Sequence, residues 1–537
     1  MSVRTDTNVR NRSKRNNLYG WRSAYIQFFL FQLIHICGFY FLEPDKPDAW
    51  LLLISGILNV LIYTRLLLAD IRYGDDDINP FWFYLGMSIL RIGVGVIYVA
   101  AIIWTGDLWA IRLGRIDAST WLMGGHLLLL VGDYCLIAGY FFGRNLFHRK
   151  RQQLFSPRSY SAANVYKAGL IMVGCGFGLR ILESFVSLGG LGQIVSYVSN
   201  YGVPAGIFMM LDSCRKKSPV NKTKIIIVIS LLMFALFSGF SSYMKTDLLI
   251  GLFPAIFIVI DLGLYRFYRS GRRNKIHFRV ILLAGFIAYF FLFTVSAYSG
   301  LRRAGYWENM ATSEVIPTQS AAPDVLPDLI KSLMASVPGT NEFDELQQYP
   351  DEGVWNMINR LSVTSWAATS VKLVEMSGMR QDSMLGAILL SITPRILYPD
   401  KPQITWGREV AVELGQARSI ETATTATSLT MSGFLYWWGG YANVIIMTFL
   451  SGVTFAFVYL LFAKDWRINP ISALVIMAMT FNGFHWKESD VLAGFPFYLY
   501  MLIVFAPLSK LLRENHLGRK RVRNLSMRNE PVTDWKR

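Results

Sequence analysis

The sequence of 537 residues is poor in charged residues, and acidic residues are the scarcer kind. Only 17% of the residues are charged, with 36 Asp and Glu against 53 Lys and Arg, for a formal net charge of +17. A basic balance often indicates phosphate binding, but here the basic residues lie in short segments between long apolar runs. We therefore expect no nucleic-acid partner. We expect the basic residues to orient the chain in a membrane and to contact anionic lipid.

Cysteine is also scarce. The chain has four, Cys37, Cys135, Cys175 and Cys214, and all lie within or beside apolar runs. This placement argues against a disulfide framework or a cysteine metal site, so we expect buried structural thiols. The sequence also lacks a phosphate-binding glycine loop, a His-Glu-x-x-His zinc motif and an internal repeat. It therefore predicts neither a metal ion nor another cofactor.

Long apolar runs are abundant, and 53% of the residues are hydrophobic. A bilayer core about 30 Å thick requires about 20 apolar residues in a helix, and lipid offers no partner to an unpaired backbone group. The predicted fold class is therefore an all-α polytopic integral membrane protein with about twelve transmembrane helices. The candidate spans are 24–42, 49–68, 80–104, 121–143, 165–185, 197–213, 224–242, 246–264, 278–298, 442–463, 470–486 and 491–512; the sixth and eleventh are short and polar.

The distribution of basic residues predicts the orientation. The stretches 1–22, 144–167, 215–224, 266–279 and 510–537 hold six, six, five, six and nine Lys and Arg, together 32 of the 53. With the spans above, all five stretches fall on one face. The positive-inside rule makes that face cytoplasmic, with both termini inside. The expected location is the bacterial inner membrane, with many passes.

These features divide the chain into five parts. They are a basic cytoplasmic N-terminal tail (1–23), a nine-span membrane domain (24–298), a large periplasmic loop domain (299–430), a three-span membrane domain (431–512) and a basic cytoplasmic tail (513–537). The loop domain has ten Lys and Arg and fifteen Asp and Glu. A loop of this length is uncommon without structure of its own. Apolar residues at helical spacing between Val354 and Leu390 predict two or three short helices within it.

Two segments near the end of the loop carry a resemblance to a known family. Residues 393–402 read Thr-Pro-Arg-Ile-Leu-Tyr-Pro-Asp-Lys-Pro, and residues 432–441 read Ser-Gly-Phe-Leu-Tyr-Trp-Trp-Gly-Gly-Tyr. They resemble the Pro-Arg…Pro-Asp-Lys-Pro element and the Gly-x-x-Tyr-x-x-Gly stretch of the Wzy-type O-antigen polymerases, the oligosaccharide repeat-unit polymerases. The resemblance is best over 355–445. The chain departs from it at Phe434, where many members have an acidic residue.

The resemblance implies a metal-independent membrane glycosyltransferase. Such an enzyme polymerises undecaprenyl-pyrophosphate-linked oligosaccharide repeat units into O-antigen or exopolysaccharide at the periplasmic face of the inner membrane. Its implied partners are the lipid-linked glycans, membrane lipid, and a chain-length regulator and a flippase of the same pathway. An O-antigen ligase, which shares the donor, is one alternative. A transporter of polysaccharide or lipid-linked sugar, such as a flippase, is another, although transporters usually have two related halves with short outer loops.

Transfer from a lipid diphosphate requires a cation for the leaving group and a base for the acceptor. Arginine suits the first role because its planar fork binds phosphate bidentately and stays charged. The candidate catalytic residues are Arg395, Asp400, His485 and Glu488. The candidate substrate-binding residues are Arg302, Arg303, Arg360, Lys401, Trp406, Arg408, Tyr436 and Lys487. Structural alternatives stay open: a proline turn for the 393–402 segment, helix anchoring for the Arg pair, a polar turn at 485–490 and an interfacial belt for the tryptophans.

Charged residues within the spans form a second set of candidates. Arg91, Asp133, Arg180 and Glu183 are costly in a bilayer unless they are paired or hydrated. Arg180 and Glu183 are three residues apart on one helical face, so they are expected to satisfy each other. Arg91 and Asp133 are a candidate pair between two helices.

Overall fold

The computed structural model describes residues 6–42, 48–73, 78–105, 119–154, 162–185, 192–215, 222–241, 363–380, 383–393, 398, 406–415, 418–420, 429–463, 466–485, 498–499 and 501–508. Most of these residues are helical, and no strand occurs among them. The helices are α1 (Asp6–Phe41), α2 (Ala49–Tyr73), α3 (Phe81–Ser88), η1 (Ile89–Val94, a π-helical segment), α4 (Gly95–Thr105), η3 (Ser119–Trp121), α5 (Leu122–Leu154), α6 (Ala162–Phe185), α7 (Gly192–Arg215), α8 (Lys222–Ser241), α15 (Thr364–Ser377), α16 (Met384–Ile392), α17 (Trp406–Glu413), α18 (Met431–Phe462), α19 (Pro470–His485) and η6 (Met501–Phe505).

Several of these helices are long and apolar enough to cross a membrane. Six segments among the described residues meet that requirement: Gly20–Phe41, Ala49–Tyr73, Phe81–Trp104, Ser119–Phe147, Asn164–Leu182 and Met431–Phe462. The predicted runs 197–213, 224–242 and 470–486 also fall on helices, namely α7, α8 and α19. The runs 246–264 and 278–298 lie outside the described residues, and 491–512 is described in part. The all-helical fold class is thus confirmed for the described residues, and six helices are long and apolar enough for a multi-pass membrane protein, whereas twelve spans and their orientation stay predictions.

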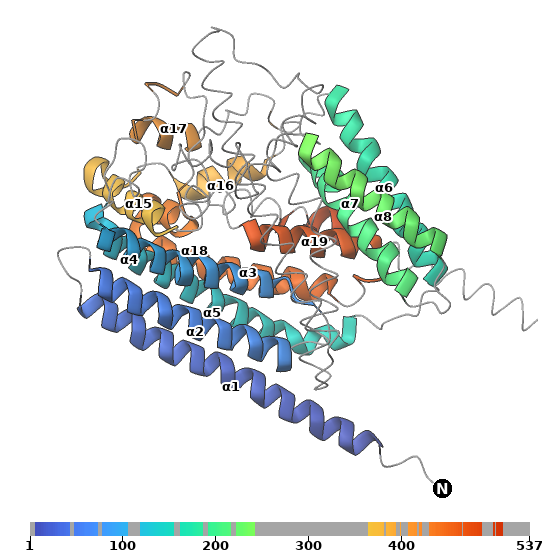
Figure 1. The fold of residues 1–537 in the computed structure, drawn as a ribbon, viewed down its shortest axis with the longest axis horizontal. Coiled ribbons are helices and arrows are strands. Elements are labelled where there is room, and N and C mark those ends of the chain that lie inside the picture. The colour runs from blue at the N-terminus through green and yellow to red at the C-terminus, as the bar shows by residue number, and fades with distance from the viewer. Residues whose placement is uncertain are drawn as a thin grey trace, which may run out of the picture.

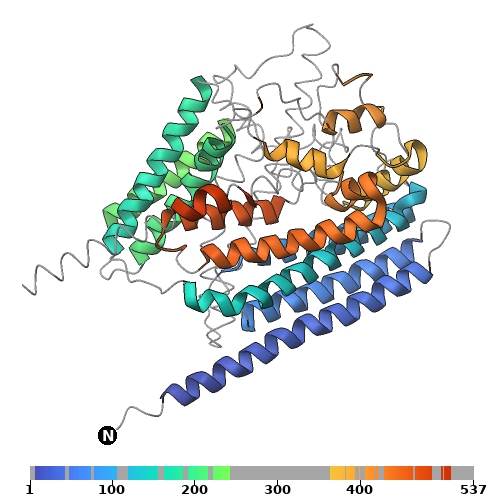
Figure 2. The same ribbon diagram turned by 180° about the vertical axis from the view of Figure 1, so that it is seen from behind.

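The helices form two groups (Figures 1 and 2). Helices α1, α2, α5 and α18 run side by side with the rod formed by α3, η1 and α4, while α6, α7 and α8 form a second group. Helix α19 packs against α3, α7 and α18 and so connects the groups. Helices α15, α16 and α17 lie on the side of the first group opposite to α1. We call the end at which α1 ends and α18 begins the loop end, and the opposite end the tail end.

Glycines allow α5 and α18 to pack closely. A Cβ atom on Gly139 would lie 2.0 Å from the carbonyl oxygen of Phe449, and one on Gly452 would lie 2.0 Å from that of Leu136. Lipid is as apolar as the helix surfaces, so membrane helices associate through close packing at small residues. The glycines on both helices therefore fix this contact.

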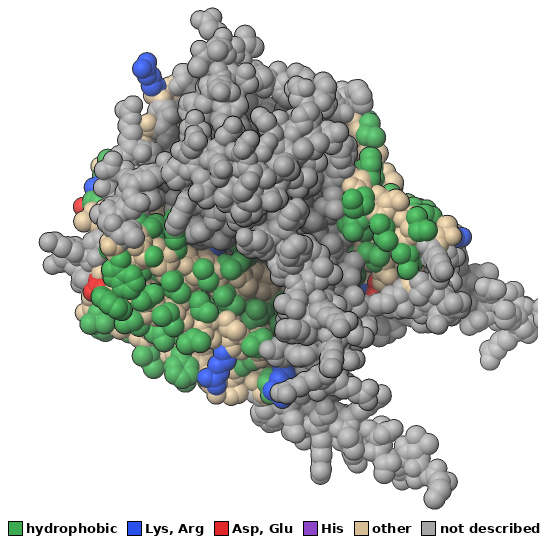
Figure 3. All heavy atoms as spheres, in the orientation of Figure 1, with side chains coloured by type: hydrophobic (Ala, Val, Ile, Leu, Met, Phe, Trp, Pro, Cys, Tyr) green, Lys and Arg blue, Asp and Glu red, His purple; other side chains and the backbone are tan. Residues whose placement is uncertain are grey.

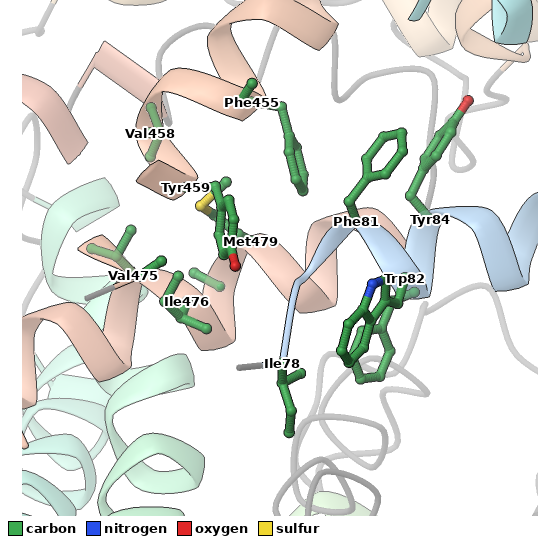
Figure 4. Close-up of a cluster of buried hydrophobic side chains, with 14 of the residues drawn as sticks. Ile78, Phe81, Trp82, Tyr84, Phe455, Val458, Tyr459, Val475, Ile476 and Met479 are labelled. Carbon is green, nitrogen blue, oxygen red and sulfur yellow. The ribbon is translucent and has the colours of Figure 1, made fainter. Parts of the chain in front are cut away.

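A shared hydrophobic cluster joins α3, α18 and α19 (Figure 4). Phe81 stacks on Tyr140 of α5, with ring centroids 3.6 Å apart and an interplanar angle of 8°. The side chains labelled in Figure 4 come from three parts of the chain: Ile78, Phe81, Trp82 and Tyr84; Phe455, Val458 and Tyr459; and Val475, Ile476 and Met479. This core attaches α19 to the first group of helices.

Apolar side chains also cover the outside of the first group (Figure 3). Ile34 is 69% exposed, and Leu61 is 60% exposed. Water-soluble proteins rarely expose a contiguous apolar surface of this kind, so the surface suits lipid. The expectation that all four cysteines are buried is wrong, because Cys37 and Cys175 are exposed and Cys135 is half-buried; only Cys214 is buried. An apolar run predicts contact with lipid as well as with protein, and the sequence does not separate the two.

The polar run 197–213 has an explanation in its surroundings. It lies in α7, which packs against α6, α8 and α19 and contains Pro204 inside the helix. Every residue from 201 to 210 is buried. Because neighbouring helices surround α7, it does not need the uniformly apolar surface of a lipid-facing span.

Candidate functional site

Helix α15, which belongs to the predicted loop domain, packs into the helix bundle at the loop end. A Cβ atom on Gly125 of α5 would lie 2.3 Å from the backbone nitrogen of Ala368. Similarly, a Cβ atom on Gly433 of α18 would lie 2.2 Å from the Ser370 hydroxyl oxygen. The N-terminal part of α15 shares a buried cluster with residues of η1 and α5, which are Ile92, Leu129 and Leu130. Part of the loop domain is therefore built into the bundle.

Helix α18 begins beside α15 and is interrupted after two turns. Thr430 caps its N-terminus by accepting a hydrogen bond from the backbone N–H of Gly433 at 2.9 Å. The helix is broken at Gly439 and at Gly440, where φ is +63° and ψ is −159°. Glycine suits Gly440 because it adopts a positive φ without steric cost. Beyond the break, the helix runs from 441 to 462, in agreement with the predicted span 442–463.

Arg380 links the end of α15 to the first part of α18. Its backbone N–H donates to the carbonyl oxygen of Trp437 at 2.9 Å. Its guanidinium carbon lies 5.1 Å from the ring centroids of both Trp437 and Trp438, a cation–π arrangement. The guanidinium group also forms a short ion pair with Glu409 of α17. Arg380 therefore joins three helices that are separated in the sequence.

The acidic part of the cluster lies on one face of α17. Glu409 and Glu413 are one helical turn apart, and Arg380 interacts with both. Glu413 is exposed, but neighbouring protein atoms remove part of its hydration, and this desolvation raises the pKa of the Glu413 carboxyl above its usual value. The Arg380 charge lowers this pKa and the Glu409 charge raises it, and both effects are smaller than that of desolvation. Glu413 thus takes up a proton more readily than an ordinary surface glutamate.

The comparisons with known proteins give no relative from which to assign this cluster. No family model, curated protein or solved structure matches the chain. In the part of the chain that the structure describes, no three His, Cys, Asp or Glu side chains form a group that could hold a metal ion. The chemistry of the cluster therefore has to be inferred from its own geometry.

Two of the predicted substrate-binding residues are described near this cluster. Arg408 is exposed on α17, next to Glu409 in the sequence. Tyr436 is half-buried on α18, and its ring contacts that of Tyr441 across the helix break, with centroids 5.1 Å apart. Trp406 begins α17 and His485 ends α19, but both side chains lie outside the described residues. So do Arg302, Arg303, Arg360, Arg395, Asp400, Lys401, Lys487 and Glu488, whose roles stay predictions.

The sequence alone does not mark Arg380 as a site residue, since it is one of ten basic residues in the loop. Its local signal is weak: it follows Gly378, which ends α15 with a φ of 79°. Its partners lie 29 residues away at Glu409 and further away at Trp437. Only the packing of α15, α17 and α18 brings these groups together.

A second polar cluster lies inside the bundle at the tail end. The carboxylate of Asp70 accepts hydrogen bonds from the indole N–H groups of Trp21 at 2.5 Å and Trp82 at 2.7 Å, and from the amide of Asn79 at 3.4 Å. It also pairs with the Arg144 guanidinium at 2.7 Å. The Arg144 side chain is 5% exposed and that of Asp70 is fully buried. Arg144 is the first residue of the predicted basic cytoplasmic stretch 144–167, and the structure places it within α5, which continues to Leu154, as a buried counter-ion of Asp70.

The charged residues predicted within the spans have different surroundings. Asp133 accepts a short hydrogen bond from the Tyr84 hydroxyl, and the charge of Arg91 on η1 attracts the same carboxylate. The Glu183 side chain lies outside the described residues, so its pairing with Arg180 stays a prediction.

Proposed function

We propose that the chain is a multi-pass membrane glycosyltransferase that polymerises oligosaccharide repeat units carried on a polyprenyl pyrophosphate. The observation that carries the proposal is the Arg380–Glu409 ion pair against Trp437 and Trp438. The two tryptophans belong to the second segment that resembles the Wzy-type polymerases. Glu409 is on α17, and residues 393–405 connect α16 to this helix, so the Pro-Arg…Pro-Asp-Lys-Pro segment directly precedes it.

The proposed reaction sets three chemical requirements. The bond between the sugar carbon and the pyrophosphate oxygen breaks, and the diphosphate leaves with the bonding electrons. An acceptor hydroxyl forms the new bond to that carbon and loses its proton to a base. Electrostatic stabilisation of the leaving charge is commonly the largest catalytic contribution, which calls for fixed cations. A base works best when its pKa is close to the working pH.

The described residues suit these requirements in distinct ways. Arg380 is already paired with Glu409 and held by two rings, so it positions α17 against α18. Arg408 projects from α17 into solvent, and we assign it, with Arg395 of the preceding segment, to the diphosphate. The raised pKa of Glu413 suits the acceptance of a proton from the acceptor hydroxyl. Trp437 and Trp438 are almost completely buried against Phe434, so they support Arg380 and do not stack on sugars.

The proposal includes an orientation. The loop end faces the periplasm of a bacterial inner membrane, because the basic tails and short basic loops then lie in the cytoplasm. The diphosphate of a membrane-bound carrier lies at head-group depth, so the proposal requires the cluster of α15, α17 and the first turns of α18 to lie near that depth.

A deletion strain complemented with variants tests the proposal. The deletion should leave single repeat units on the acceptor in a gel of the surface glycan, and the wild-type gene should restore the polymer ladder. We expect Arg380→Ala to abolish the ladder and Arg380→Lys to restore it in part, because lysine keeps the charge but lacks the planar fork. Arg418→Ala, at an exposed arginine of the same loop, is the control and should polymerise normally.

Other outcomes would reject the proposal. Polymer that accumulates on the lipid carrier without transfer to the acceptor indicates a ligase. A normal ladder in the deletion strain excludes polymerisation by this protein. A normal ladder from Arg380→Ala at wild-type protein levels shows that the Arg380 cluster is not required for the reaction.

A further inference from the structure

One face of α2 carries a stripe of buried polar residues along most of its length. Ser55, Asn59, Tyr63 and Asp70 are spaced by four, four and seven residues and are all buried. Such spacing places them on one side of a helix. The stripe faces polar side chains of α1 and α5, which run beside α2 in the first group of helices (Figure 1). Bilayer-facing helices rarely bury this many polar groups without a functional reason.

The polar contact nearest to the loop end links two histidines through a serine. The Nε2 atom of His35 on α1 lies 2.9 Å from the Ser55 hydroxyl oxygen, which lies 2.6 Å from Nε2 of His126 on α5. His126 is fully buried. The Nδ1 atoms of both rings are buried and have no hydrogen-bond partner. The two rings and the hydroxyl thus form a chain with an unused nitrogen at each end.

Two further layers of polar groups lie deeper in the bundle. Gln32 donates from its amide to the Asn59 carbonyl oxygen at 3.2 Å, while Oε1 of Gln32 and Nδ2 of Asn59 are buried without partners. Below them, Asp133 accepts from Tyr84, and its Oδ2 atom is buried without a partner. Asp133 lies eleven residues from the start of α5, or about 16 Å, which is close to the middle of a bilayer core of about 30 Å.

Unused polar atoms in an apolar interior have a cost that water removes. A buried donor or acceptor left without a partner costs about 1–3 kcal/mol. Buried polar groups in proteins are commonly satisfied by internal waters that bind two to four of them. Such atoms in these three layers include Nδ1 of both histidines, Gln32 Oε1, Asn59 Nδ2, the Tyr63 hydroxyl oxygen and Asp133 Oδ2. Their donor and acceptor types are mixed, which suits water.

We propose that α1, α2, α3 and α5 enclose a hydrated proton path from His35, Ser55 and His126 to Asp133, and that the protein conducts protons. A proton from water binds Nδ1 of His35, whose Nε2 proton passes to the Ser55 hydroxyl. The Ser55 proton passes to Nε2 of His126, and His126 releases its Nδ1 proton to the next water. One proton enters and one leaves, with no change in the charge of the three groups.

The path ends in this structure at an apolar layer. Phe28, Leu66 and Ile137 are buried between the level of Asp133 and the Asp70–Arg144 pair. The groups that face Asp133 are Tyr84, Tyr63, Ser88 and the cation Arg91. Arg91 stabilises the carboxylate until a proton arrives. Conduction across the whole membrane therefore requires this apolar layer to admit water or to open.

Proton flux into liposomes tests the inference without any glycan, so its result is independent of the proposed polymerase activity. The purified full-length protein is reconstituted into vesicles that contain a pH-sensitive dye, and a potassium diffusion potential drives protons inward. We expect acidification well above that of protein-free vesicles. We expect Asp133→Asn to reduce it at least tenfold, because asparagine keeps the bond from Tyr84 but does not bind a proton.

A matched control distinguishes loss of the path from loss of the fold. Thr448→Val changes another buried polar residue, whose hydroxyl bonds only to the carbonyl of Val444 in its own helix, and it should conduct as the wild type does. All variants are compared at equal amounts of monodisperse protein. Wild-type flux no greater than that of empty vesicles overturns the inference, and so does wild-type flux from Asp133→Asn.

Discussion

Replacement of Arg144 by methionine tests whether this arginine is a buried counter-ion. In Arg144→Met the carboxylate of Asp70 stays in the bundle without its cation. Breaking a buried ion pair by removing one partner costs about 3–5 kcal/mol. The indole donors of Trp21 and Trp82 remain on Asp70, so we expect a loss at the lower end of that range, about 3 kcal/mol.

The opposite change should cost more. Asp70→Leu removes the carboxylate that pairs with Arg144 and accepts from the indole N–H groups of Trp21 and Trp82, and loss of the acceptor of a buried donor costs about 1–3 kcal/mol. The double variant Asp70→Asn/Arg144→Met removes both buried charges of this pair, and the asparagine carbonyl still accepts from one indole. Since neutral replacement of a buried pair is often tolerated, the double variant should be more stable than Arg144→Met.

Thermal unfolding of the detergent-purified protein, followed by fluorescence-detected size exclusion, gives the order of stability. A loss of 1 kcal/mol lowers the melting temperature of a 150–250-residue domain by about 2–4 °C, and less for a longer chain. We expect a decrease on the order of 5 °C for Arg144→Met and a larger one for Asp70→Leu. Arg72→Met, at an exposed arginine near the same end of α2, should melt as the wild type does.

The result that refutes the reasoning is an unchanged melting temperature for Arg144→Met. Arg144 would then contribute nothing measurable to stability as a counter-ion of Asp70. A double variant less stable than both single variants would refute the assumption that the pair acts as a unit.

Three further predictions concern helix packing, pH and orientation. Gly139→Leu should force α5 away from α18 and lower the melting temperature, because even a Cβ atom at this position would lie 2.0 Å from a carbonyl oxygen. Gly174→Leu should leave the melting temperature unchanged, because a Cβ atom at Gly174 would have no neighbour within 4 Å. The raised pKa of Glu413 makes the folded state bind more protons than the unfolded state at pH values between the usual and the raised pKa, so this group lowers the stability of the fold as pH rises through that window. The melting temperature of Glu413→Gln should equal that of the wild type at about pH 4 and exceed it at about pH 7. Equal melting temperatures of variant and wild type at both pH values would contradict the raised pKa. Reporter fusions after residues 160, 220 and 275 should report cytoplasm and fusions within 310–420 periplasm, and a cytoplasmic signal from 310–420 would reject the orientation.

Much of the helical framework could be predicted because the length of an apolar run is a local property. The runs 24–42, 49–68, 80–104 and 121–143 each correspond to a helix that could cross a membrane. The apolar runs did not give the helix ends: α5 continues to Leu154, beyond the predicted span 121–143, because a helix can extend past the apolar residues that cross the lipid. The apolar composition of a segment predicts the part of a helix that can lie in lipid and not the full length of the helix.

The candidate site could be predicted only in part. Helix α15 falls within the predicted stretch 354–390, and α16 begins in it and ends two residues beyond it, at Ile392. The chemistry of Arg408 and Tyr436 made both of them candidates. Arg380 was not named, because a single arginine after a helix-ending glycine carries no local signal of its partners. Its role depends on the ion pair with Glu409 and on two tryptophan rings, which are contacts between three helices.

The sequence by itself determined that this protein is built from helices and that several of them are apolar enough for a membrane, since both properties depend on neighbouring residues. It did not determine which side of each helix faces protein and which faces lipid, because an apolar run satisfies either environment. Tertiary structure decided this, and with it the fate of the polar residues: Asp70 meets Arg144 across 74 residues, and Ser55 meets His126 across 71. Such pairs form because a polar group in an apolar interior is stable only beside a partner, and the helix contacts decide which partners are within reach.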